Sequence, residues 1–104
     1  MIVTVVQFKL PEPITLAQAK DIFSSTAPKY RTVGGLIRKN YILSEDGKMA
    51  GGVYVWKSRN DAENLYDDQW RAFVMEKYGS EPTVQYFESP VLVDNVAGEI
   101  ITDG

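Results

Sequence analysis

The chain contains no cysteine and no histidine among its 104 residues. The absence of cysteine excludes disulfides, thiolate metal sites and cysteine nucleophiles, and it is compatible with a reducing cytoplasm, where we expect the protein to be. The absence of histidine removes the usual general base near neutral pH, the commonest metal ligand and the usual axial ligand of haem. Base catalysis would therefore use a carboxylate, a lysine, a tyrosine or water.

Long apolar runs and concentrated positive charge are also missing. No stretch approaches the roughly 20 apolar residues that span a bilayer, and the first residues do not form a signal peptide. The net charge is −3, and the densest basic stretch is only Arg38-Lys39. Because a polyanion-binding protein needs a connected basic surface, we expect neither nucleic acid nor a membrane as a partner. Glycine-rich phosphate loops and the nucleophile-elbow motif of hydrolases are absent as well.

Aromatic side chains, in contrast, are abundant. Six tyrosines, four phenylalanines and two tryptophans make up 12% of a chain whose length suits one domain. This surplus over the needs of a small core indicates a lined pocket or a self-interface. The alternative is that the tyrosines fill a sheet face that is half exposed to water.

The hydrophobic pattern predicts six elements in the order β-α-β-β-α-β. We expect strands at residues 2–10, 36–44, 49–57 and 83–93, and helices at 15–27 and 58–77. This order is that of a ferredoxin-like α+β domain with a four-stranded antiparallel sheet, whose first and third strands lie in the middle. We assign residues 1–95 to this domain and residues 96–104 to a tail or arm.

Local signals set the expected ends of these elements. Thr15 and Gln18 have the spacing of a helix-capping box, and Pro28 is expected to end the first helix. Asp46-Gly47 is the strongest hairpin signal in the chain. Pro90 marks an edge or a bulge in the last strand.

The hairpin predicts two apolar faces. A turn at Asp46-Gly47 pairs Lys39 with Tyr54, unless a bulge shifts the register by one residue. Without cover, the sheet would then expose an unusually large apolar patch formed by Tyr41, Leu43, Tyr54 and Trp56. We expect an identical subunit to cover the helix-free face, so that a homodimer closes an α+β barrel. The rival is a monomer whose tail folds back over the sheet.

Gly51-Gly52 lies in a strand that is expected to be central, where glycine weakens packing and costs backbone entropy. One interpretation is a bulge or a tight bend in a curled sheet. The other is that the missing side chains open space for a ligand beside Tyr41 and Tyr54. Both can hold together.

Four segments carry a family resemblance: GLIRKNYIL (35–43), AGGVYVW (50–56), NDAENLYDDQWRAFVMEKYG (60–79) and VQYFESPVLVDN (84–95). They resemble the YdhR-like family, within the antibiotic-biosynthesis mono-oxygenase group of dimeric α+β barrels. The resemblance implies a reaction without metal or flavin, because an electron-rich phenolate or enolate reacts with O₂ directly. Haem-degrading members of the fold bind haem through a histidine, which this chain lacks.

Six residues are candidates for a site. Asn40 is the candidate catalytic residue, because its amide is suited to hold a substrate carbonyl or a developing oxyanion; alternatively, it satisfies backbone groups near a sheet edge. Arg38 would lower the pKa of a bound phenol, or else be solvated or paired with Glu45 or Asp46. Tyr54, Trp56 and Tyr86 are the predicted walls of a planar pocket for a small aromatic ligand; alternatively, they pack in the core or an interface. Trp70 with Arg71 would cap this pocket from the second helix, or else Trp70 is a core anchor and Arg71 is exposed.

The sequence thus predicts a cofactor-independent mono-oxygenase that oxidises a small electron-rich aromatic or quinol-like compound with O₂. One alternative is a non-catalytic small-molecule-binding or stress-related dimer. A second is an isomerase or lactone-processing enzyme, because the same barrel hosts those activities. The adjacent pair Asp67-Asp68 is expected to be a solvated helix face and not a catalytic pair, since neighbouring helical residues point apart.

Overall fold

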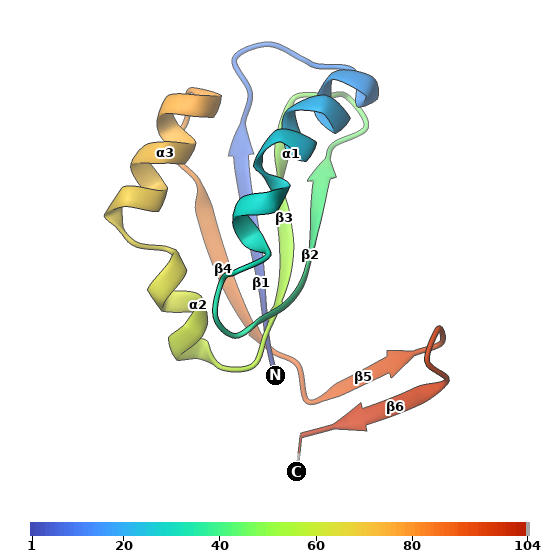
Figure 1. Ribbon diagram of the computed structural model, residues 1–104. Coiled ribbons are helices and arrows are strands. Elements are labelled where there is room, and N and C mark those ends of the chain that lie inside the picture. Colours follow the sequence, from blue (N-terminus) through green and yellow to red (C-terminus); the bar gives the residue numbers. More distant parts are fainter. Residues whose placement is uncertain (104) are drawn as a thin grey trace.

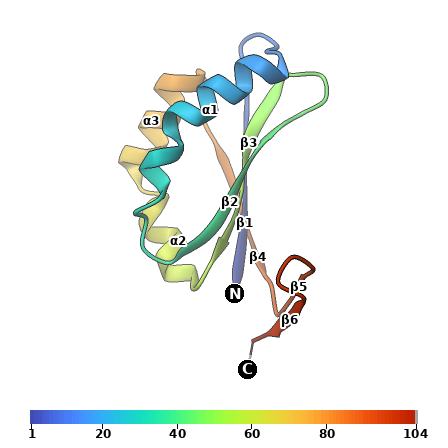
Figure 2. The same cartoon turned by 45° about the vertical axis from the view of Figure 1, so that its right-hand side comes forward.

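A computed structural model describes residues 1–103 and shows an antiparallel sheet whose helices all cover one face (Figures 1 and 2). The sheet has the strand order β2-β3-β1-β4 and consists of β1 (Ile2–Lys9), β2 (Leu36–Leu43), β3 (Met49–Trp56) and β4 (Thr83–Glu88). The helices are α1 (Leu16–Tyr30), α2 (Arg59–Leu65) and α3 (Asp68–Tyr78). The predicted ferredoxin-like α+β fold, with β1 and β3 in the middle, is confirmed. Among the described residues, no helix is long and apolar enough to cross a membrane.

Helix α1 begins as predicted and ends later. The Thr15 hydroxyl accepts from the Gln18 N–H at 3.1 Å, and the Gln18 side-chain oxygen accepts from the Thr15 N–H at 2.8 Å, so the capping box is confirmed. The prediction that Pro28 ends the helix is wrong, because the helix continues to Tyr30. Pro28 has no N–H to donate within the helix, but the chain after it stays helical and Tyr30 is buried in the core.

The predicted second helix is two helices with a break at Tyr66 and Asp67. Asp67 and Asp68 are exposed as predicted, but Asp67 lies just before α3 and caps it by accepting from the Trp70 N–H at 2.8 Å, so its predicted place within a helix is wrong. The break also turns Tyr66 toward the sheet, where its hydroxyl lies 2.6 Å from the Thr4 hydroxyl of β1. Capping and burial together explain the change of direction.

The β2-β3 register follows the prediction over most of its length. Lys39 pairs with Tyr54. An irregularity between Leu36 and Arg38 makes Leu36 the partner of Trp56 at the start of β2. The predicted bulge alternative therefore applies at the end of the hairpin and not at its turn.

The aromatic patch expected to be bare is instead under the helices. Tyr54 is 2% exposed and Trp56 is 0% exposed, and the Trp56 indole N–H donates to the Thr4 hydroxyl at 2.9 Å. The register determines which residues share a face, but it does not say which face the helices cover. We call the other side the helix-free face; its apolar side chains are Val3, Val5, Ile42, Val53, Val55 and Phe87.

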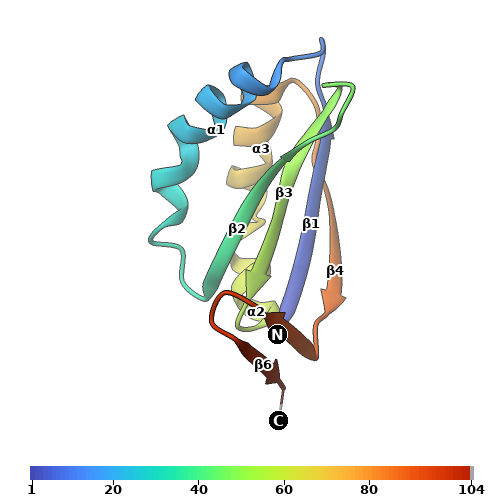
Figure 3. The same cartoon turned by 90° about the vertical axis from the view of Figure 1, so that its right-hand side faces the viewer.

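The predicted last strand is divided, and its end forms a separate hairpin. β5 (Val91–Asp94) pairs with β6 (Glu99–Thr102), and the hairpin projects from one end of the sheet (Figure 3). Pro90 lies in the gap between β4 and β5. Asp94 closes the turn by accepting from the backbone N–H groups of Val96 and Ala97. Residues 99–102 of the predicted tail are thus paired with β5, and Gly104 lies outside the described residues.

The two glycines of β3 serve different needs. A Cβ at Gly51 would lie 1.8 Å from the Val6 carbonyl oxygen, so the backbones of β1 and β3 approach too closely there for a side chain. The β1-β3 register runs through this point without a shift, so no bulge is involved. Gly52 faces the helices and is considered with the site.

We predict that Gly51→Ala lowers the free energy of unfolding by about 1–3 kcal/mol, because the methyl group must displace backbone rather than a flexible side chain. Urea unfolding measures the change. Gly34→Ala is the matched control, since a Cβ there meets no atom within 4 Å. Equal midpoints for the Gly51 and Gly34 variants would contradict the close approach.

Candidate functional site

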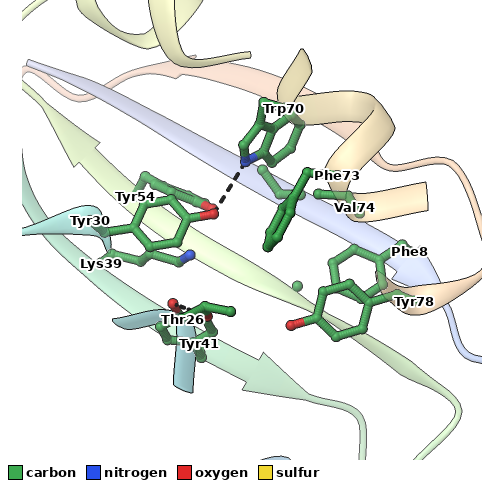
Figure 4. Close-up of a pocket in the computed structure, with 12 residues that line it drawn as sticks. Phe8, Thr26, Tyr30, Lys39, Tyr41, Tyr54, Trp70, Phe73, Val74 and Tyr78 are labelled. Carbon is green, nitrogen blue, oxygen red and sulfur yellow. Dashed lines mark hydrogen bonds between the residues drawn. The ribbon is translucent and has the colours of Figure 1, made fainter. Parts of the chain in front are cut away.

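A small cavity lies between the helices and the sheet. Its volume is about 20 Å³, room for about one water molecule. Strands β1, β2 and β3 form one side, and α1 and α3 form the other (Figure 4). Most of the lining residues are aromatic: Phe8, Tyr30, Tyr41, Tyr54, Trp70, Phe73 and Tyr78. A flat, mostly aromatic enclosure of this kind suits a planar ligand once the side chains move apart.

Hydrogen bonds hold two parts of this wall in place. The Trp70 indole N–H of α3 donates to the Tyr30 hydroxyl of α1 at 3.2 Å. The Tyr41 hydroxyl of β2 lies 2.7 Å from the Thr26 hydroxyl of α1. Side-chain hydrogen bonds therefore join α1 both to α3 and to the edge strand β2 (Figure 4). They tie together three of the elements that form the wall.

Lys39 supplies the one cationic side chain in the described lining of the cavity. Its Nζ lies 3.3 Å from the ring centroid of Tyr30, 3.8 Å from that of Tyr41 and 4.6 Å from that of Tyr54. Figure 4 shows this nitrogen pointing into the space between the rings. Within residues 1–103, no carboxylate lies within 4.0 Å of it. The ammonium is thus held by aromatic faces rather than by an ion pair.

Burial lowers the pKa of Lys39 from its ordinary value of 10.5 to about 7, and the nearby charge of Lys29 acts in the same direction. The three tyrosine rings oppose this shift, because aromatic faces attract the ammonium form. Burial also raises the pKa of the Tyr54 hydroxyl, and raises that of Tyr78 to about 12. Lys39 is therefore the group of this cavity whose charge can change near neutral pH.

A wider hollow adjoins the cavity at the surface, between α1 and β2. It has a volume of about 310 Å³. Tyr30, Lys39 and Tyr41 line both the hollow and the cavity, so these three side chains form the partition between them. Arg31 and Arg38 lie on the outer side of the partition.

Gly52 makes room for this partition. A Cβ at Gly52 would lie 2.9 Å from the Tyr54 ring and 3.1 Å from Cε of Lys39. The space predicted beside Tyr54 therefore exists, and the lysine stem occupies it. A larger residue at position 52 would push Lys39 away from the tyrosines.

The structure divides the predicted pocket residues. Tyr54 and Trp70 line the cavity. Trp56 stacks on Tyr54 with ring centroids 5.9 Å apart but lies outside the lining. Tyr86 lies on edge strand β4, where the Arg59 guanidinium carbon lies 4.2 Å from its ring centroid.

Asn40 and Arg38 lie on the other side of the sheet. Asn40 pairs with Val53 on the helix-free face and is exposed, so the structure does not bring it to the cavity. Its catalytic role remains a prediction. Arg38 reaches the outer hollow, and its one ion pair within residues 1–103 is with Asp94 at 3.8 Å, not with either predicted partner in the β2-β3 loop.

Lys39 is the residue that sequence reasoning missed. A signal was present: on the predicted register, it is the one charged residue on the face that carries Tyr41, Tyr54 and Trp56. A lysine in an edge strand usually reads as solvated, and here its burial depends on α1 folding over it.

Comparison with known proteins rests on structure alone. No protein-family model and no curated protein matches the chain. A mono-oxygenase from the gene ActVA-Orf6 of Streptomyces coelicolor, in complex with nanaomycin D, is 21% identical with a TM-score of 0.64, covering 85% of this chain and 86% of that chain. SnoaB, a cofactor-independent oxygenase of Streptomyces nogalater, is 16% identical with a TM-score of 0.61, covering 85% and 91%. An antibiotic-biosynthesis mono-oxygenase is 12% identical with a TM-score of 0.62, covering 86% and 98%. At these identities the chain shares their fold.

We predict that Lys39 gives the protein a distinctive pH dependence of stability. Its pKa is about 7 in the folded state and 10.5 ordinarily, so the unfolded chain binds more protons between these values. Raising the pH from 7 to 10 therefore stabilises the wild type relative to Lys39→Met, by roughly 2–4 kcal/mol. Below pH 7 the difference between the two proteins is constant.

Urea unfolding at pH 6, 7, 8, 9 and 10 measures this difference. Lys20→Met, which removes an exposed lysine of α1, is the control and should follow the wild type. Parallel curves for the wild type and Lys39→Met would show that the lysine is not held in a desolvated place.

Proposed function

We propose that the protein is a cofactor-independent mono-oxygenase that oxidises a small, electron-rich aromatic or quinol-like compound with O₂ in the cavity beside Lys39. The observation that carries this proposal is the aromatic-walled cavity with a single half-buried lysine. The fold is shared with mono-oxygenases, one of them described as cofactor-independent. Within that group we assign the chain to the YdhR-like family, on the four segments that resemble it.

The chemistry follows from the charge of Lys39. In its neutral form, the amine can accept the proton of an acidic O–H or C–H group on the substrate. The ammonium that results then stabilises the phenolate or enolate, whose electrons reduce O₂. For an anthrone, the two C–H bonds of the CH₂ group are replaced by a C=O bond to one oxygen atom. The other oxygen atom leaves as water with these two hydrogens, and the substrate supplies all four electrons. The aromatic walls orient the ring and exclude solvent.

A non-catalytic small-molecule-binding protein is the second candidate. The observation that favours it is the size of the cavity, which accepts about one water as it stands. A binder would be stabilised by its ligand without consuming oxygen. An isomerase would convert its substrate without oxygen.

We predict O₂ consumption with a panel of hydroquinones and anthrones, measured with an oxygen electrode. Lys39→Met should lower kcat/KM by about 10²-fold or more, because it removes both the proton acceptor and the counter-charge. Lys20→Met should match the wild type. Turnover that is lost in Asn40→Ala and unchanged in Lys39→Met would place the reaction on the helix-free face and contradict the proposal.

We also propose that the protein is a homodimer whose subunits meet through the helix-free faces. This face is apolar at its centre, where Val5 and Val53 pair across β1 and β3. The β5-β6 hairpin projects beside it and exposes apolar side chains of its own: Val91, Val93, Val96, Ile100 and Ile101. A second copy offers the matching apolar face, since a two-fold axis brings the same surface to both sides.

We predict that light scattering at micromolar concentration reports twice the mass of one chain. Val53→Asp should give a folded monomer, because it places a charge at the centre of the contact. Ser24→Asp, on an exposed position of α1, is the control and should remain dimeric. A monomeric wild type would contradict the dimer, as would a dimeric Val53→Asp protein.

A further inference from the structure

Cations surround the opening of the cavity, although the chain is acidic overall. Arg31, Arg38 and Lys39 line the outer hollow. Lys29 lies close by, with its Nζ 3.7 Å from the ring centroid of Phe73. Of these four, only Arg38 has a carboxylate within 4.0 Å among residues 1–103. The net charge of the chain is −3, so a local cluster of positive side chains without matching carboxylates is not explained by overall composition. Such a cluster indicates an anionic ligand.

Lys39 has no carboxylate to pair with its ammonium within residues 1–103. Among these residues no side-chain nitrogen or oxygen is both fully buried and without a hydrogen-bond partner, so the half-buried Nζ keeps contact with solvent beside the hollow. The rings of Tyr30, Tyr41 and Tyr54 attract the charge, but their faces are weak acceptors. A negatively charged oxygen entering from the hollow would be a stronger acceptor than the water it replaces.

The Lys39 side chain is also part of the partition that separates the cavity from the hollow. The cavity of about 20 Å³ and the hollow of about 310 Å³ are divided by Tyr30, Lys39 and Tyr41. Tyr41 is held by its contact with Thr26, and Tyr30 by the hydrogen bond from Trp70. Lys39 is the member of the partition without such a tie, and its four-carbon stem is flexible. Movement of this one side chain would join the two spaces.

We propose that Lys39 is a charge-operated gate and that the site binds planar aromatic anions with a negatively charged oxygen at the edge of the ring system. The anion draws the ammonium away from the tyrosine rings and toward the hollow, and the aromatic ring then enters through the place that Lys39 leaves between Tyr30 and Tyr41, with the hydrogen bond from Trp70 to Tyr30 intact. This rests on the proposed function in that both use the same cavity, and it adds a charge requirement and an entry route.

The groups that face Lys39 come from four elements. They are Lys29 and Tyr30 of α1, Tyr41 of β2, Tyr54 of β3 and Tyr78 of α3. No carboxylate is among them. Burial raises the pKa of Tyr41, Tyr54 and Tyr78, so these phenols do not titrate where Lys39 does. Binding of a permanent anion should therefore weaken as the pH rises through 7 and Lys39 loses its charge.

The test compares 2-naphthoate with 2-naphthamide, which have nearly the same shape and differ in charge. A carboxyl group with a pKa of about 4 is ionised throughout pH 6–9, so the ligand itself does not titrate. Isothermal calorimetry should give at least about tenfold tighter binding of the naphthoate at pH 6, and this preference should fall by pH 9. Fluorescence of Trp70 in the cavity wall gives a second readout.

Two variants separate charge from packing. Lys39→Met should bind the acid and the amide equally, because it keeps the length and removes the charge. Lys39→Arg should keep the preference for the acid at pH 9, because guanidinium remains charged. Lys20→Met is the control for a general change in net charge and should retain the wild-type preference and pH profile.

Equal binding of 2-naphthoate and 2-naphthamide by the wild type would contradict the proposed gate. The absence of naphthoate binding at millimolar concentration would contradict it as well. An acid preference that survives in Lys39→Met would overturn it as well. The wild-type comparison needs no variant and holds even if a variant fails to fold. Binding is measured here without turnover. Charge-selective binding with no O₂ consumption would therefore contradict the mono-oxygenase proposal and support the anion site.

Discussion

The account depends on one ammonium group held against three tyrosine rings without a carboxylate. Lys39 lies where it does because β2 and β3 pair it with Tyr54, and because Gly52 leaves space for its stem. Helix α1 then covers it with Tyr30. Without the β2-β3 pairing, the space at Gly52 or the cover by Tyr30, the Lys39 side chain would lie in solvent, and the cavity would lose its charged group. A half-buried cation without a carboxylate partner costs stability, and we take its retention as functional.

Much of the fold could be predicted, because periodicity and turn signals are local properties. The element order, the capping box at Thr15 and the pairing of Lys39 with Tyr54 follow from neighbouring residues. The covered face could not be deduced, since both faces of the hairpin are apolar and alternation alone does not rank them. For the same reason the pattern places Tyr54 and Tyr41 on one face correctly, but it does not predict that the helices cover this face. The break before Asp67 carried a capping signal that an otherwise continuous helical pattern concealed.

The site was only partly predictable. Aromatic residues such as Tyr54 and Trp70 reach the cavity because large apolar side chains turn toward the core in any such fold. Lys39 required knowledge of tertiary structure, since its surroundings come from four separate elements. Asn40 follows it in sequence and points the other way, as the pleat of a strand demands. A choice between these two neighbours is thus a choice between the two sides of the sheet, and the helix-free side is the one we assign to the dimer.

A crystal structure of the protein with a bound aromatic phenolate or carboxylate tests the location of the site most directly. The account predicts the ring between Tyr30, Tyr41 and Trp70, with the charged oxygen within hydrogen-bond distance of Lys39 Nζ. A ligand that lies instead on the helix-free face beside Asn40, with Lys39 still enclosed by its three tyrosines, would contradict it.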